Sequence, residues 1–128
     1  MTEQRHEELL GRLEAAVGDG LEFVARYTLR DSDILYGEAW FERYTASVEA
    51  RSRDDMHQDG IHRLEQAAVG GELYETDVHA ETTITEQGIG VYLYPSEKVG
   101  YFVWVSEGTA VELPTLVDEC LDVMDGDA

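Results

Sequence analysis

The chain has 128 residues, 43% of them hydrophobic, which is a common size for one domain and enough to bury a core without disulfides or metals. Its 28 Asp and Glu residues outnumber nine Lys and Arg, for a formal net charge of −19. We therefore expect a single domain over residues 1–128, and we exclude a disordered chain and a basic nucleic-acid-binding protein.

The acidity predicts a surface adapted to a salt-rich cytoplasm. Lys98 is the only lysine, asparagine is absent, and the acids are spread evenly, 15 in residues 1–69 and 13 in residues 70–128. The Debye length falls from ~10 Å at 0.1 M salt to ~3 Å at 1 M, so multimolar salt would remove most of the self-repulsion. The alternative is an acidic interaction protein or a nucleic-acid mimic, but these usually concentrate their charge in runs or on one face.

The remaining composition favours a cytoplasmic protein. Cys120 is the only cysteine, so no internal disulfide can form. The N-terminal sequence has no apolar leader, and no apolar stretch approaches the 18 residues of a transmembrane helix. We therefore expect no membrane partner.

The first third of the chain predicts a helix followed by two strands. Apolar residues recur at helical spacing over residues 3–17, and Gly18-Asp19-Gly20 ends the pattern. Residues 21–29 then alternate apolar and polar side chains, which is typical of a strand with one buried face. Residues 34–36 are expected to return as a short second strand.

The middle of the chain, residues 39–69, predicts helix with an interruption near Asp59-Gly60. We expect either two helical pieces or one kinked helix here. The expected buried stripe consists of Trp40, Tyr44, Val48, Ile61, Leu64 and Ala68.

The last half predicts three strands and a helix. Gly70-Gly71 is expected to close the helical region, and strands are expected over 73–85, 88–94 and 100–106, joined by short turns. A final helix opens at Pro114, a favourable first helical position. The element order is thus α-β-β-α(α)-β-β-β-α, an α+β fold with one five-stranded, mainly antiparallel sheet flanked by helices.

This element order resembles the profilin-like and roadblock-type fold, in which helices pack on the faces of a five-stranded antiparallel sheet. In addition, the LRDSDILY turn and the VDECLDVM helix resemble a family of small acidic haloarchaeal proteins with no assigned activity. The first resemblance implies a fold and the second implies a host. Neither supplies a catalytic residue.

The sequence contains no convincing catalytic, cofactor or metal site. An EF-hand loop starting at Asp55 would need a bidentate Glu at position 12, where Gln66 stands. His57 and His62 are five residues apart and would diverge by about 140° on a helix, whereas metal ligands favour a spacing of four. No nucleophile elbow or phosphate loop is present. We therefore expect no cofactor and favour a protein that is not an enzyme.

One constellation remains, an aromatic sheet face with a polar edge. A two-residue turn at Glu86-Gln87 and a four-residue turn at 96–99 would place six residues on one face: His79, Glu81, Tyr92, Tyr94, Tyr101 and Val103. Such a face fits a dimer or partner surface, because monomers rarely expose large apolar patches. The alternative is that a helix of the same chain covers it.

The functional hypothesis is a non-enzymatic interaction module that binds itself or another protein, through this face or through a sheet edge. The alternative hypothesis is a small-molecule sensor with a pocket between sheet and helices, lined by Tyr92, Tyr94 and His79. Nucleic acid is not an expected partner, because acids accompany the arginines even where these are densest, in residues 39–69.

Overall fold

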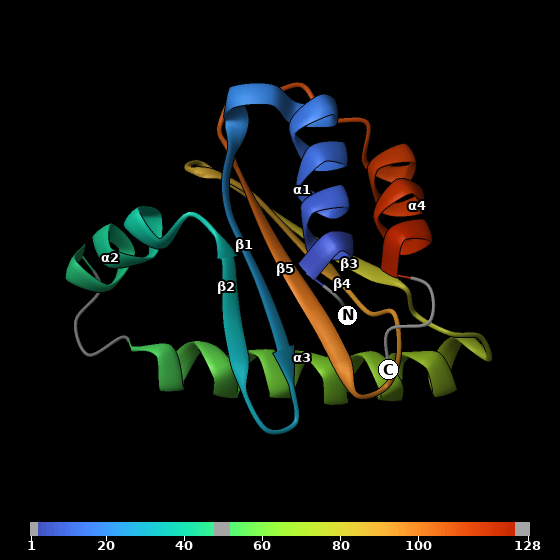
Figure 1. The fold of residues 1–128 in the computed structure, drawn as a ribbon. Helices are drawn as coiled ribbons and strands as arrows, with labels where there is room; N and C mark the ends of the chain where they lie inside the picture. The colour runs from blue at the N-terminus through green and yellow to red at the C-terminus, as the bar shows by residue number, and fades with distance from the viewer. Residues whose placement is uncertain (1–2, 48–51, 125–128) are drawn as a thin grey trace.

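The structure is a computed structural model that describes residues 3–47 and 52–124. Its elements follow in the order α1 (Glu3–Val17), a 3₁₀ turn (Gly18–Gly20), β1 (Leu21–Thr28), β2 (Ser32–Tyr36), α2 (Glu38–Ser47), α3 (Arg53–Tyr74), β3 (Ala80–Thr85), β4 (Gly88–Leu93), β5 (Val99–Ser106) and α4 (Leu113–Met124). This order confirms the predicted α+β fold class (Figure 1).

The strands of the described residues form one antiparallel sheet in the order β2-β1-β5-β4-β3. β2 and β3 are therefore its edges, and β5 lies at its centre. The Glu86-Gln87 turn is confirmed, because Thr85 pairs with Gly88 and Glu81 pairs with Tyr92.

One face of the sheet is covered by α1 and α4, which lie side by side (Figure 1). Leu9 and Leu13 of α1 and Leu116 and Cys120 of α4 are buried against the sheet. The 3.6-residue period of both helices places these side chains on one stripe, as the sequence predicts.

The opposite face is covered by α2 and α3. Phe41 of α2 packs on Phe23 and Ala25 of β1, and Leu64 and Ala67 of α3 pack on the tyrosines of β1 and β4. Of the expected middle stripe, Leu64 is buried, Ala67 replaces Ala68 as the buried alanine, and Val48 lies outside the described residues.

The expectation that β1 buries one face only is wrong. Leu21 and Val24 are buried on the α1/α4 side, whereas Phe23, Ala25 and Tyr27 are buried on the α2/α3 side. The pairing of β1 with β5 shifts between Leu21 and Phe23, so that Leu21 and Val24 point the same way despite their odd spacing. Burial on both faces is the consequence of helices on both sides of the sheet.

Two helical pieces are present in residues 39–69, as expected, but the place of the interruption is wrong, because α3 runs unbroken through Asp59 and Gly60. A Cβ atom on Gly60 would lie 2.8 Å from the ring of Tyr27. Glycine at this position therefore allows the helix to approach β1 closely and does not end it. Ser52 caps the N-terminus of the helix, where its side chain accepts a hydrogen bond from the backbone N–H of Asp55.

The strand expected over 73–85 starts later, because α3 continues to Tyr74 and β3 begins at Ala80. Glu75 ends the helix in the left-handed conformation, with φ of 57°. A Cβ on Gly71 would lie 3.1 Å from the carbonyl oxygen of Thr76, so this glycine provides room for the chain that folds back toward β3.

Candidate functional site

The six residues predicted to share one face are divided between the two faces of the sheet. Glu81, Tyr92 and Tyr94 lie on the α3 side. Tyr101 and Val103 are fully buried in the α1/α4 core. His79 is exposed and precedes β3, where its carbonyl oxygen accepts a hydrogen bond from the N–H of Tyr94.

The division follows from the register of β4 and β5, which differs from the expected one by a single residue. A four-residue turn at 96–99, as expected, would pair Tyr92 with Val103 and Tyr94 with Tyr101. This is wrong, because Tyr92 pairs with Phe102 and Leu93 with Tyr101. A shift of one residue moves every side chain to the opposite face. The connection contains Pro95, which has no N–H for the ladder, and Ser96, whose Oγ accepts a hydrogen bond from the N–H of Lys98.

A buried tyrosine cluster lies under α3. The Tyr94 hydroxyl donates a hydrogen bond of 2.9 Å to Oε1 of Glu81. The Tyr27 hydroxyl is buried without a hydrogen-bond partner in the described residues, although its ring fills the space between Gly60 and Gly100. Burial raises the pKa of both phenols well above the ordinary value of 10.0.

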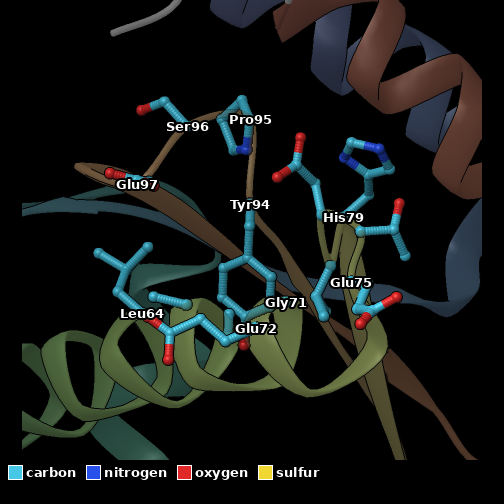
Figure 2. A pocket seen from close by; sticks show the side chains of 14 residues that line it. Leu64, Gly71, Glu72, Glu75, His79, Tyr94, Pro95, Ser96 and Glu97 are labelled. Carbon is cyan, nitrogen blue, oxygen red and sulfur yellow. The ribbon is translucent and has the colours of Figure 1, made fainter.

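Between α3 and the β4–β5 connection is a cavity of about 530 Å³ with an acidic rim. Figure 2 shows Tyr94 pointing toward α3 at its base, with Glu72 and Glu75 on the helix side and His79 and Glu97 near the strands. This cavity contains two of the three residues expected to line a pocket, Tyr94 and His79. Among the residues that the structure describes, no three His, Cys, Asp or Glu side chains are grouped closely enough to hold a metal ion.

A second cavity, of about 230 Å³, lies between the sheet and the helices α2 and α3 and is mainly aromatic. Its walls include both tryptophans of the chain and the third expected pocket residue, Tyr92. The full aromatic lining is Phe23, Tyr27, Trp40, Phe41, Tyr44, Tyr92, Phe102 and Trp104, with Ser32, Ser52, Asp59 and Gln87 as polar members. We name this space the aromatic cavity.

Apart from Tyr27, the rings of the aromatic cavity form a continuous network. Trp40 is central, with ring centroids 4.8 Å from Phe23, 5.3 Å from Tyr44 and 5.8 Å from Trp104. On the neighbouring wall the guanidinium carbon of Arg63 lies 4.2 Å from the centroid of the Tyr92 ring. This distance is that of a cation–π contact.

A third feature is a set of exposed apolar side chains at the C-terminal end of α3 and, on the other side of the sheet, on the edge strand β3. The side chains of Val69, Leu73 and Tyr74 are 65%, 76% and 70% exposed, and Ile84 on β3 is 73% exposed. The sequence predicted that Leu73 and Tyr74 belong to a strand over residues 73–85. This is wrong, because both residues lie in the last turn of α3. The spacing of Val69 and Leu73 by four residues is the signal that could have placed them there.

The sequence predicted Tyr92 as a pocket residue but did not predict the aromatic side chains around it. The observed β4–β5 register places Phe102 opposite Tyr92, and Trp104 then contacts Phe102, so the register expected from the sequence could not have shown this wall. No helix in the described residues has the length and hydropathy required to cross a membrane.

In fold, the protein is similar to the gliding protein MglB from Thermus thermophilus, with a TM-score of 0.60 over 94% of this chain and 88% of that one. The two sequences are 12% identical, so the likeness concerns the fold alone. It agrees with the profilin-like and roadblock-type element order expected from the sequence. No protein-family model matches the chain, and no curated protein does.

Proposed function

We propose that the protein is a self-associating interaction module of a salt-rich cytoplasm, which pairs through the edge strand β3 and the exposed end of α3. The expected aromatic face is divided and covered by helices of the same chain, so the alternative expectation, a sheet edge, is the remaining route. The observation that carries the proposal is the combination of an unprotected edge strand with exposed Val69, Leu73 and Tyr74 on the helix that leads into it.

β3 is the better suited of the two edges. Its ladder with β4 is regular over six residue pairs, and its sequence AETTIT contains no lysine or proline. Natural edge strands usually carry such residues, or bulges, to prevent pairing with another chain. β2 has this protection, because its ladder with β1 is irregular between Val24 and Ala25.

The backbone of β3 offers a second strand its hydrogen-bonding groups. Because His79 O bonds to Tyr94 N, and pairing alternates along an antiparallel ladder, Glu81 and Thr83 bond toward β4. The backbone groups of Ala80, Thr82 and Ile84 therefore point outward. The edge strand of a second copy can form hydrogen bonds with these backbone groups, as β4 does with those of Glu81 and Thr83.

The acidic surface supports the salt-rich setting. Glu65 and Glu72 are exposed on α3 beside Val69, so two copies would bring like charges together at low salt. Multimolar salt screens this repulsion and strengthens apolar contacts. We therefore assign the chain to a halophilic host, of the archaeal kind that its LRDSDILY and VDECLDVM segments resemble.

A proline in β3 tests the proposed pairing. Thr82→Pro removes an outward N–H and leaves the β3–β4 bonds of the neighbouring residues in place. In ~3 M KCl we expect the wild-type chain to sediment as a dimer. The variant should sediment as a folded monomer, with near-UV circular dichroism unchanged. A wild-type monomer, or a variant that stays dimeric, would contradict pairing through β3.

Ligand binding is a second candidate function, and the aromatic cavity favours it. This cavity lies between sheet and helices, where a sensor pocket was expected, and Tyr92 lines it. None of Val69, Leu73, Tyr74 and Ile84 lines it, so the two functions are compatible in one molecule.

A further inference from the structure

The aromatic cavity is limited to a small occupant. Its volume of about 230 Å³ corresponds to roughly eight water molecules at about 30 Å³ each. Pockets for drug-sized molecules are larger, about 300–1,000 Å³. Protein interiors are otherwise close-packed, so an aromatic space of this size between a sheet and two helices is a candidate binding site.

The rings of the wall are partly tilted and partly stacked. The Trp40 ring plane is tilted by 33° from that of Phe23 and by 36° from that of Trp104, and it is nearly parallel to that of Tyr44, at 8°. Each ring face carries partial negative charge, which attracts cations.

The charged side chain that lines the cavity is also negative. Asp59 contributes a carboxylate, and none of the described residues that line the cavity is a lysine or an arginine. The chain as a whole carries −19. Arg63 lies over the Tyr92 ring at 4.2 Å, which places one positive charge beside the cavity and occupies that ring face, so Trp40 and Trp104 are the rings left for a ligand cation. The wall therefore combines apolar surface with a preference for positive charge.

We propose that the aromatic cavity binds a small organic cation of the quaternary-ammonium class, held by Trp40, Trp104 and the Asp59 carboxylate. A methylated ammonium is weakly hydrated and can leave water for an aromatic wall, whereas K⁺ must give up a strong hydration shell. This difference allows selection even where K⁺ is abundant. The inference rests on the second candidate function and gives it a ligand class; it does not depend on self-association.

The two tryptophans provide the assay. Both Trp residues of the chain line the cavity, so intrinsic tryptophan fluorescence reports on it alone. Choline is the probe, and 3,3-dimethylbutan-1-ol, which replaces its nitrogen by carbon, is the neutral control of the same shape. Titrations are carried out at fixed ~3 M KCl, so that ionic strength does not change.

Three variants assign the response to the cavity. Tyr44→Leu removes a lining ring that is 37% exposed, and Asp59→Asn removes the carboxylate. Tyr36→Leu is the matched control, since Tyr36 is 38% exposed and does not line the cavity. All three positions are exposed, and near-UV circular dichroism verifies that each variant is folded.

We expect saturable binding of choline, about tenfold tighter than that of the alcohol, as one cation–π contact in a partly desolvated site provides. Tyr44→Leu and Asp59→Asn should weaken it several-fold, and Tyr36→Leu should not. Equal affinity for choline and the alcohol would overturn the cation class but leave ligand binding in place. No saturable response to either, or equal weakening by Tyr36→Leu, would overturn the site itself.

Discussion

The ring of Tyr27 lies directly against the backbone of Gly60, so close that a Cβ atom on this glycine would be 2.8 Å from the ring carbons. This contact fixes the distance between α3 and the sheet. It also positions the wall that the two residues share in the aromatic cavity. A residue that normally ends a helix is here the residue that allows the helix to pack.

We expect Gly60→Ala to destabilise the protein by about 1–2 kcal/mol, because overpacking costs about 1–3 kcal/mol and better helix propensity returns up to about 1. Gly11→Ala is the control, since a Cβ on Gly11 in α1 meets nothing within 4 Å. It should stabilise by up to about 1 kcal/mol. Urea unfolding in high salt measures both, and a stabilising Gly60→Ala would contradict the contact.

Removal of the Tyr27 hydroxyl and removal of the Tyr94 hydroxyl should have different effects on the stability of the protein. Tyr27→Phe removes a buried hydroxyl that has no partner in the described residues, so stability should stay constant or rise by about 1 kcal/mol. Tyr94→Phe removes the hydrogen bond to Glu81 and should cost about 1–3 kcal/mol. Equal losses in the two variants would show that Tyr27 has a partner after all.

Stability should fall as the pH rises above about 10. Burial raises the pKa of Tyr27, Tyr92 and Tyr94 in the folded protein, so the folded chain keeps protons that the unfolded chain releases near pH 10.0. The stabilisation is therefore complete below pH 10 and is lost above it, by about 1.4 kcal/mol per pH unit for each of Tyr27 and Tyr94, whose pKa values are raised most. Urea unfolding from pH 9 to 11 measures the slope. Tyr27→Phe should reduce it by one tyrosine's share, and a flat profile would contradict the burial.

The fold should depend on salt, and Cys120 reports on it. Its thiol is buried between α1 and α4, and burial raises its pKa to about 12, so a thiol reagent should not label the native chain. As KCl falls below ~1 M and screening weakens, labelling should accelerate while near-UV circular dichroism is lost. Slow labelling and a full native signal in 50 mM salt would show that the surface does not require high ionic strength.

The sequence predicted the element order and the β3–β4 register because these depend on local signals, the apolar periods and the Glu86-Gln87 turn. It did not predict the β4–β5 register, because the connection through Pro95 has no fixed-length turn signature. The effect on the site is large, since one residue of shift places Phe102 instead of Val103 opposite Tyr92. Gly60 was misread for a related reason: a glycine that accommodates a tyrosine from another element looks, in sequence, like a helix breaker.

Self-association through the β3 edge and the end of α3 is tested most directly by sedimentation equilibrium in ~3 M KCl with a pair of matched variants. Leu73→Glu places a charge in the proposed contact, and Leu29→Glu makes the same change at a position that is 54% exposed near the opposite edge of the sheet. We predict a dimer for the wild type and for Leu29→Glu, and a folded monomer for Leu73→Glu. A monomeric wild type, or a Leu73→Glu variant that stays dimeric, would contradict the account.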